Sequence, residues 1–292
     1  LTQAQVKSKK LEKEFWCRKN SNGEWKPNKV IVSPRESQHL IPNSENLDRV
    51  VLLIDENANL KKTNLLNYID KAEKEGLNKR KTLASRKVWY SMEKLKNAPI
   101  LFAMIHHDRQ GVFANKENVL VDHNLFEIFP HKKVDTLPIL CFLLSTVGML
   151  FKELIGRSNL GEGALKTEGV DIKEILVPKV FDKEVRRKLR NLAKKYPNPE
   201  INSIFKDLGV DSPAEVSFEK VRPDRLELDK IVLRDILGLS EKEHLEVYQA
   251  VVDLVKSRLE KAKSVGKKSK KSEASLGGAF AENFVEDLKN GH

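Results

Sequence analysis

The chain has 292 residues, and its 53 Lys and Arg exceed its 42 Asp and Glu to leave a formal net charge of +11. A surface with this charge attracts polyanions, most often nucleic acid. Cys17 and Cys141 are too few for a disulfide framework or a cysteine-ligated zinc site, which favours a reducing, cytoplasmic location. Residues 1–19 are charged and the longest apolar run, residues 137–151, is short, so we expect neither a signal peptide nor a membrane partner.

The first part of the chain favours a polar segment, then strands and one helix. Residues 1–40 are mostly polar, and we interpret them as an N-terminal segment that could end a preceding domain. Residues 30–32 and 49–54 predict strands, because they are β-branched and bounded by prolines or polar residues. Residues 64–75 predict a helix with one apolar face, ended by Gly76.

A basic run follows this helix. Residues 71–96 contain nine Lys and Arg against three Glu, with Trp89 and Tyr90 among them. Basic side chains beside aromatic rings suit phosphate contacts combined with base or sugar contacts. The alternative, favoured for both aromatic residues, is that the rings belong to a core beneath a solvated face. We keep Tyr90 as a candidate DNA contact together with Lys79, Arg80, Lys81, Arg86 and Lys87.

Short strands are predicted next, at residues 99–106, 111–114, 119–121 and 125–129, with the first two as a hairpin. Polar residues at their turns are candidates for reading base edges, because Arg pairs with guanine and Asn with adenine. These candidates are Arg109, Asn115 and Asn124. For the two asparagines the alternative is turn chemistry, since Asn tolerates a left-handed backbone and its side chain caps its own turn.

The histidines at the end of the first strand suggest a rival hypothesis. His106, His107 and Asp108, with Asp122, could form an unrecognised enzyme active site. Adjacent residues on a strand point to opposite faces, so one metal ion rarely takes both histidines, and we expect no metal site.

Residues 137–155 predict one buried helix, apolar nearly all round and ended by Gly156. The loop of residues 156–169 follows. Its Gly161-x-Gly163 step is too short for a dinucleotide or phosphate-loop fingerprint. The loop does place Arg157 and Lys166, two further candidate phosphate contacts, beside backbone that can approach a ligand closely.

Beyond residue 181 the pattern is helical. Ser240 and Glu243 form a capping box for a long amphipathic helix with core-facing Tyr248 and Val252. After residue 265 the chain is rich in Lys, Ser and Gly and is expected to be disordered. The fold class predicted is α+β, with a mixed sheet and a buried helix followed by a C-terminal helical segment.

The order of motifs from residue 85 to 178 resembles the C-terminal target recognition region of adenine-specific DNA methyltransferases of restriction–modification systems. The pattern is Arg-x-x-Trp-Tyr, a Pro-led strand, Asn on a turn, Gly-Arg, a Gly-x-Gly-Ala-Leu-Lys loop and Val-Pro. The residues that carry it are Arg86, Trp89, Tyr90, Pro99, Asn124, Gly156, Arg157, Gly161, Gly163, Ala164, Leu165, Lys166, Val177 and Pro178.

The resemblance implies double-stranded DNA as the partner and residues 41–180 as a DNA target recognition domain. Residues 181–264 would be a helical subdomain, and 265–292 a basic tail. The Asn/Asp-Pro-Pro-Tyr/Phe motif that grips a flipped adenine in this family is missing, because the chain has no Pro-Pro pair. We therefore expect no catalytic or cofactor-binding residue here, and an excised domain or a separate specificity polypeptide.

S-adenosylmethionine would then serve an attached or partner catalytic domain. A nuclease is not expected, since Pro223-Asp224 is not followed within thirty residues by the acidic-x-Lys pattern of such metal sites. A nucleic-acid binder without sequence preference is the third hypothesis.

Overall fold

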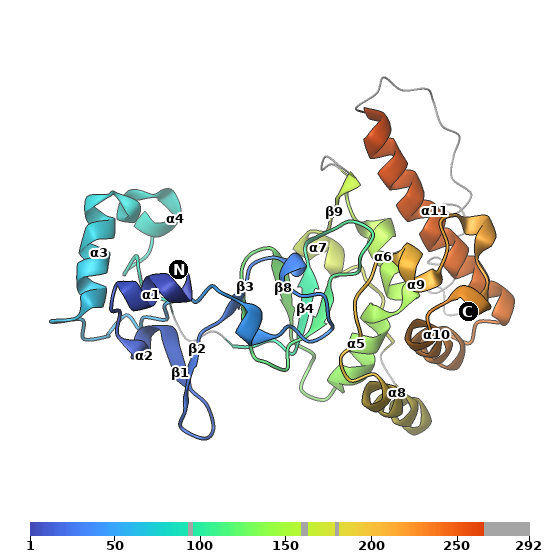
Figure 1. The fold of residues 1–292 in the computed structure, drawn as a ribbon, viewed down its shortest axis with the longest axis horizontal. Helices are drawn as coiled ribbons and strands as arrows, with labels where there is room; N and C mark the ends of the chain where they lie inside the picture. The colour runs from blue at the N-terminus through green and yellow to red at the C-terminus, as the bar shows by residue number, and fades with distance from the viewer. Residues whose placement is uncertain (93–95, 159–162, 179–180, 266–292) are drawn as a thin grey trace.

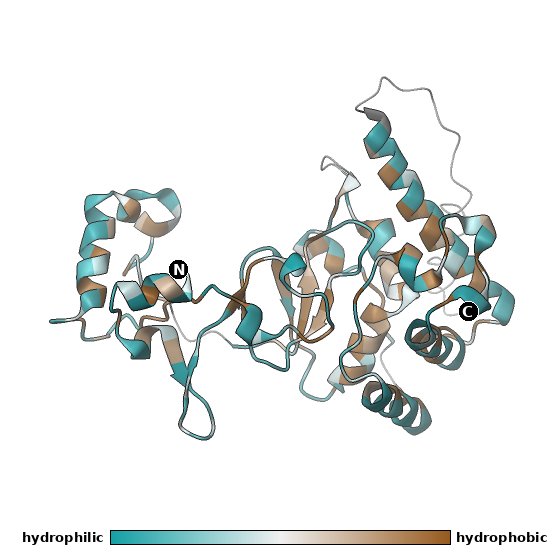
Figure 2. Cartoon of the chain, in the orientation of Figure 1, coloured by the Kyte–Doolittle hydropathy of each residue, from teal (hydrophilic) through white to brown (hydrophobic). Residues whose placement is uncertain are grey.

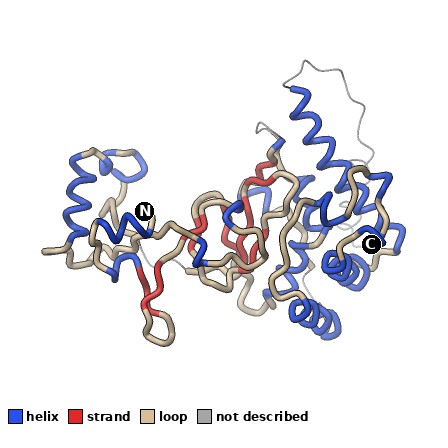
Figure 3. Tube along the Cα trace, in the orientation of Figure 1, coloured by secondary structure: helices blue, strands red, loops and turns tan. Residues whose placement is uncertain are grey.

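The computed structural model describes residues 1–92, 96–158, 163–178 and 181–265. Figure 1 shows an elongated molecule, with a small lobe near the N-terminus, strands in the middle and helices towards the C-terminus. The strands of the middle part are short and lie among long loops (Figure 3). This arrangement confirms the predicted α+β class with a C-terminal helical segment. The expected disorder after residue 265 lies outside the described residues.

The N-terminal lobe is built from two separate stretches, residues 1–29 and 49–92, because residues 30–48 leave it to join the middle of the molecule. Glu12 links the lobe's helices, since its carboxylate accepts from the backbone N–H groups of Asn64 (2.6 Å) and Leu65 (3.1 Å). The predicted helix at 64–75 is confirmed, with Thr63 as its N-cap. The lobe contains α1 (Gln3–Ser8), α2 (Lys13–Trp16), β1 (Cys17–Lys19), β2 (Trp25–Pro27), α3 (Asn64–Lys74) and α4 (Lys81–Ala84).

The strand predicted at residues 49–54 is wrong. Only two isolated bridges form there, from Arg49 to Thr2 and from Val50 to Lys29. The backbone bonds of the segment go to several different segments, so no continuous ladder forms along it. Its apolar residues are used instead as core, with Val50 and Ile54 each 2–3% exposed. Burial of a β-branched side chain therefore does not require a sheet here.

The middle of the molecule centres on β4, which pairs antiparallel with β6 and β8. The predicted hairpin is confirmed, with Phe102 opposite Val112. The single strand expected at residues 99–106 is broken at Met104, whose N–H donates to the Asn124 carbonyl. The strands are β3 (Val30–Ile31), β4 (Ile100–Ala103), β5 (Ile105–His106), β6 (Val112–Ala114), β7 (Leu120–Val121), β8 (Leu125–Ile128) and β9 (Leu165–Lys166).

Two more strand pairs connect distant parts of the chain. β3 pairs parallel with β7 and brings residues 30–31 to the middle region. β5 pairs antiparallel with β9, so His106 lies opposite Leu165 of the glycine-containing loop. The strands predicted at residues 30–32, 119–121 and 125–129 are thereby confirmed to within a residue or two.

The buried helix predicted at residues 137–155 is two helices, α5 (Thr136–Leu144) and α6 (Thr146–Ile155), bent by 68°. At the break, the Leu144 carbonyl accepts from Arg225, and Asp229 accepts from the N–H (2.8 Å) and hydroxyl (2.6 Å) of Thr146. The Leu144 carbonyl and the Thr146 N–H, which the bend leaves without helical partners, thus find partners on α10 (Pro223–Asp229). Gly148 allows the close turn, because a Cβ there would lie 2.5 Å from the Phe142 carbonyl oxygen.

The remaining helices enclose the largest core, in which Val147, Leu208, Val232 and Val252 are fully buried or nearly so. The capping box is confirmed, since Ser240 Oγ accepts from the Glu243 N–H and the Glu243 carboxylate from the Ser240 N–H. These elements are α7 (Gly169–Ile172), α8 (Lys183–Lys195), α9 (Ile204–Leu208), the π-helix η7 (Lys230–Ile236) and α11 (Glu241–Val265).

Among the described residues, no single helix is long and apolar enough to cross a membrane. The bent pair α5 and α6 meets the criteria of length and composition only when its two helices are joined.

Arg225→Ala is expected to destabilise the protein by about 3–5 kcal/mol, because one oxygen of buried Asp207 and the Leu144 carbonyl lose their donor. Urea denaturation followed by circular dichroism measures the change. Lys188→Ala is the control, since it breaks an exposed ion pair with Asp235. Equal losses of stability in the two variants would contradict a role for Arg225 at the helix break.

Lys152 provides a second prediction, because its side chain is fully buried and its Nζ lies 4.1 Å from the Phe102 ring centroid without a hydrogen-bond partner. Burial lowers the pKa of Lys152 from 10.5 to about 7. The unfolded chain therefore binds the proton more tightly, and stability should rise with pH between about 7 and 10.5.

Lys152→Met should remove this rise and stabilise the protein most at pH 7 and below. Denaturation midpoints across that pH range, compared with Lys183→Met on the exposed surface of α8, provide the measurement. A slope unchanged in Lys152→Met would mean that another group titrates.

Candidate nucleic-acid interface

The positive charge of the chain is concentrated in the N-terminal lobe. Residues 1–29 and 49–92 contain 18 Lys and Arg against 8 Asp and Glu, whereas residues 93–265 contain 29 against 27. The outer helices of the lobe are mostly hydrophilic in Figure 2. A polyanion therefore meets its strongest attraction at the lobe and not at the helical end of the molecule.

Three exposed basic residues lie on the turn that begins α4. Lys79, Arg80 and Lys81 are exposed, and none of their side chains has a hydrogen bond or ion pair with another described residue. Arg86 is exposed and makes one long contact, 3.5 Å, to the Ser91 carbonyl. Lys87 is 3.4 Å from the exposed Glu56 carboxylate. The structure thus groups the predicted phosphate contacts of this run, and leaves three of them unpaired.

Trp89 and Tyr90 are half-buried and pack against the lobe's own core of Leu65 and Ile69. Their rings meet edge to face with centroids 5.7 Å apart, and Trp89 Nε1 donates to Glu73 (2.7 Å). These contacts support the core interpretation for both rings. A nucleic-acid contact by Tyr90 stays a prediction.

A hollow that we call the arginine groove lies between the lobe and the strands. Arg49 and Arg86 line it, beside apolar walls that include Val32 and Val121. Its volume is about 480 Å³. The one acidic lining residue, Asp122, accepts a 2.9 Å hydrogen bond from His123, which lowers its pKa. The sequence analysis missed Arg49, because its partner in the groove is 37 positions away along the chain.

A second hollow, the polar pocket, has a volume of about 350 Å³ and brings several predicted residues together. Arg109 and Asn124 both line it, but their donors are engaged. Arg109 donates to the Ile201 carbonyl (2.7 Å) and to that of Ser37, and Asn124 donates to the Val32 carbonyl (2.9 Å). The pocket is lined by Ser33, Pro34, Arg35, Ile105, His106, His107, Asp108, Arg109, Gly111, Phe113 and Asn124.

Asn115 is not in this pocket. Its side chain is buried, donates to the Ala98 and Val119 carbonyls and accepts from the Val119 N–H, all at 2.8–2.9 Å. Every hydrogen-bonding group of the amide but one lone pair is thus committed, two of them to Val119 in its own turn and one to Ala98. The geometry favours the turn alternative for Asn115.

His106 would be the base of the rival enzyme hypothesis, yet it is only 4% exposed. Its Nε2 lies 3.5 Å from Oε1 of Glu153, too long for a strong hydrogen bond. Desolvation and the nearby Lys152 charge lower the pKa of His106 to about 4, so the imidazole is neutral at pH 7. In the described part of the chain, no three His, Cys, Asp or Glu side chains are arranged to hold a metal ion.

Arg258 of α11 connects the polar pocket to the rest of the molecule. It donates to both oxygens of Glu153 on α6 (2.8 and 2.9 Å), to the His107 carbonyl (2.6 Å) and to the Gly163 carbonyl. The Glu153 side chain is 2% exposed, and its contacts with His106 and Arg258 lower its pKa despite burial. The sequence gives one signal for this residue, a charged position on the buried face of an amphipathic helix.

The glycine-containing loop is packed more tightly than expected. Gly163 has φ +72°, and a Cβ there would lie 3.1–3.3 Å from Leu259 and Ala262 of α11. Gly156 is the C-cap of α6, but its φ of −72° is not left-handed. A glycine is needed there because a Cβ would collide with the Leu165 side chain. The expectation that this backbone is open to a ligand is therefore wrong for Gly163, whereas Gly161 lies outside the described residues.

Arg157 and Lys166 close the base of this loop. Their backbones exchange two hydrogen bonds, of 2.8 and 3.0 Å. Their side chains pair with Asp171 (2.7 Å) and Glu168 (2.6 Å) respectively. A phosphate would have to compete with these carboxylates, so contacts by Arg157 and Lys166 stay a prediction.

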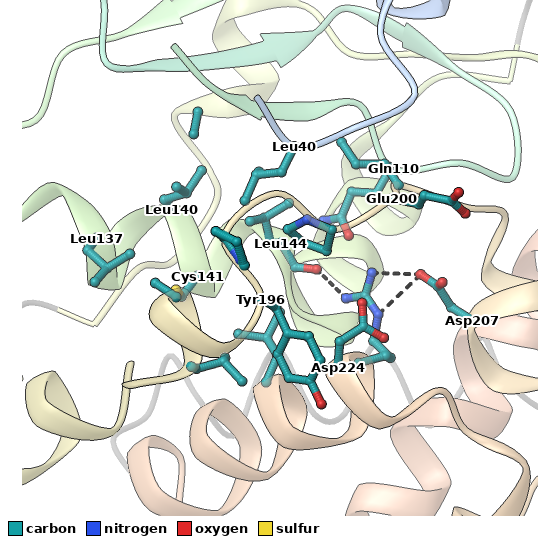
Figure 4. A pocket seen from close by; sticks show the side chains of 18 of the residues that line it. Leu40, Gln110, Leu137, Leu140, Cys141, Leu144, Tyr196, Glu200, Asp207 and Asp224 are labelled. Carbon is teal, nitrogen blue, oxygen red and sulfur yellow. Dashed lines mark hydrogen bonds and ion pairs between the residues drawn. The ribbon is translucent and has the colours of Figure 1, made fainter. Parts of the chain in front are cut away.

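An apolar pocket of about 110 Å³ lies where the strands meet the helices, and Figure 4 shows it with Leu137, Leu140 and Cys141 on one side and Tyr196 on another. Burial raises the pKa of the Cys141 thiol to about 12, so it is not a nucleophile at neutral pH. Arg225, which also lines this pocket, is paired with Asp207 (2.8 Å).

Gly163→Ala is expected to lower the melting temperature more than Gly76→Ala. Both glycines have positive φ, +72° and +78°, so both variants carry the same backbone strain. Only Gly163 also has neighbours within 4 Å, because Gly76 faces open space. Equal shifts in calorimetry would show that the contact with α11 contributes nothing.

Residues 2–208 match the family described as "Type II methyltransferase M.Eco57I, C-terminal domain". The chain is 30% identical over 140 residues to the type II methyltransferase M.AccI of Acinetobacter calcoaceticus, covering 46% of this chain and 26% of that protein.

Among solved structures, the type IIG restriction endonuclease BpuSI has a similar fold, with a TM-score of 0.53 at 13% identity. That match covers 91% of this chain and 28% of BpuSI. The chain thus spans about a quarter of the length of these relatives. Because the family match extends over residues 2–208, well beyond half of the sequence, the chain belongs to the family of the C-terminal domain of type II methyltransferase M.Eco57I, a restriction–modification methyltransferase.

Proposed function

We propose that this chain is the DNA target recognition region of an adenine-specific methyltransferase of a restriction–modification system. It binds duplex DNA and specifies the sequence that a catalytic domain outside these residues methylates. The observation that carries the proposal is the exposed, unpaired cluster of Lys79, Arg80 and Lys81 on a lobe that holds most of the positive charge. Membership of the methyltransferase family supplies the biological setting.

The basic lobe acts on the DNA backbone. Each Lys or Arg that neutralises a phosphate releases a condensed counterion, so this contact is strong, independent of sequence and weakened by salt. Lys79, Arg80 and Lys81 have no carboxylate to leave before they meet a phosphate. Arg49 and Arg86 in the arginine groove continue the positive surface towards the strands. The lobe thereby positions the duplex without reading it.

Sequence reading then belongs to the strand turns beside the groove. The side chains of Arg109 and Asn124 shape the polar pocket, because they donate hydrogen bonds to the backbone carbonyls of Ile201 and Val32. The side-chain oxygen of Asn124 accepts none of these bonds. Exposed turns on a rigid scaffold are where base-edge contacts are usually made.

S-adenosylmethionine and the catalytic domain complete the proposed enzyme. The methyl donor supplies the transferred group when it is bound by that domain. This chain contributes orientation, since it has no Asn/Asp-Pro-Pro-Tyr/Phe sequence to grip an adenine. Like the DNA on which it acts, the protein is placed in the cytoplasm by this proposal.

We expect duplex DNA binding by this chain to weaken steeply with salt, with a log–log slope of roughly −4 to −5 if four to six phosphates are neutralised. The variant with Lys79→Ala, Arg80→Ala and Lys81→Ala should flatten the slope by about 2–3 and weaken binding to all sequences alike. Fluorescence anisotropy at several salt concentrations measures both effects.

The matched control removes three exposed lysines from the helical part, Lys183→Ala, Lys194→Ala and Lys230→Ala. It loses the same charge and should keep the slope of the original chain. If both triple variants bind alike, the attraction comes from net charge alone and the basic lobe is not the interface. A slope near zero in the unmodified chain would overturn the proposed function itself.

A further inference from the structure

The arginine groove and the polar pocket are neighbours, separated by two short segments. In the first, Val32 lines the groove and the next residue, Ser33, lines the pocket. In the second, Asp122 lines the groove and Asn124 the pocket. The two segments are joined by the hydrogen bond from Asn124 Nδ2 to the Val32 carbonyl (2.9 Å). The groove and the pocket are thus bordered by the same two segments, at residues 32–33 and 122–124.

The pocket contains polar groups without partners. The Asp108 carboxylate has no hydrogen bond or ion pair with a described residue, although the charge of Arg109 is close. Nδ1 of the buried His106 has no hydrogen-bond partner among the described residues, whereas Nε2 faces Glu153 at 3.5 Å. A buried polar group without a partner costs free energy, so it points to something that fills the site.

The shape and rim of the pocket narrow the class of occupant. Pro34 and Ile105 provide apolar walls, and the exposed Arg35 provides a cation at the edge. The volume of about 350 Å³ is at the small end of the range for ligand sites. A flat heterocycle with donors on its edge and a phosphate attached outside matches this combination of carboxylate, apolar wall and rim cation.

We propose that the polar pocket receives an unpaired nucleobase that carries an amino group, from a DNA strand whose phosphates lie in the arginine groove. The inference rests on the proposed duplex-binding function and adds a second, base-specific site to it. Asp108 accepts hydrogen bonds from the amino group of the base, and the buried His106 lies behind it in the pocket wall.

Only an unpaired base can use these contacts. In a duplex the Watson–Crick edge is occupied by the opposite base, and it becomes free when the nucleotide turns out of the stack. Adenine, cytosine and guanine then present an amino group to the Asp108 carboxylate. Thymine presents one N–H between two carbonyl oxygens, and the Asp108 carboxylate repels these oxygens.

The test uses this chain and a set of labelled duplexes that differ only in one extra, unpaired nucleotide. The inserted nucleotide is A, C, G, T or abasic, and the fully paired duplex is the reference. We expect at least one of the amino-bearing insertions to bind about tenfold more tightly than the T and abasic insertions. The abasic duplex controls for the greater flexibility of any bulged DNA.

Asp108→Asn should remove this preference and raise the relative affinity for the T insertion, because the amide can donate to a thymine carbonyl. Binding to the paired duplex should not change. Asp211→Asn, an exposed carboxylate in the helical part, is the matched control and should keep the original preference. Arg35→Ala provides a second variant on an exposed residue, and should weaken binding to the preferred bulged duplex several-fold more than to the paired one.

Equal affinity for all five bulged duplexes would overturn the pocket proposal, as would a preference that survives in Asp108→Asn with an unchanged thermal melt. Failure of the proposed function has a different signature, which is a paired duplex that binds without salt dependence. The two outcomes are read from separate duplexes, so each proposal can fail alone.

Discussion

The guanidinium of Arg258 holds together the parts of the molecule that carry its candidate site. It joins α11 to Glu153 on α6, to the His107 carbonyl at the polar pocket and to the Gly163 carbonyl in the loop. Buried charges are tolerated when every one of them is paired and hydrogen-bonded. Because Glu153 supplies the compensating carboxylate, a segment more than 100 residues away in sequence becomes part of the wall behind the pocket. The helical part of the protein therefore supports the polar pocket through buried contacts, and this support does not require a charged outer surface.

Local patterns predicted the elements whose cause is local. The helix at Asn64–Lys74, the β4–β6 hairpin and the capping box at Ser240 all follow from spacing and turn chemistry within a few residues. The break at Ser145 could not be found in this way. Its donors and acceptors are satisfied by α10, about 80 positions further along the chain, and the apolar run itself reads as continuous helix. Distant partners decide where an apolar run bends.

The candidate site likewise contains residues that local sequence predicted and residues that only the fold brings together. The basic run around Lys79 was found from composition, and its exposure follows from its place on a turn. Asn115 shows why residue type alone is ambiguous, since the groups that could read adenine are the groups that hold its turn. Arg49 and Arg86 become neighbours only after β3 has carried the chain to the strands and back. No spacing rule in the sequence expresses that path.

The two-part construction of the N-terminal lobe limits how specificity can be exchanged between relatives. Residues 1–29 and 49–92 fold together, while residues 30–48 between them belong to the strands and line both hollows. A recombination point inside this region would separate the phosphate-binding surface from the wall of the pocket that it adjoins. Chimeric enzymes should therefore inherit residues 1–92 together, so that the lobe keeps the segment that lines both hollows.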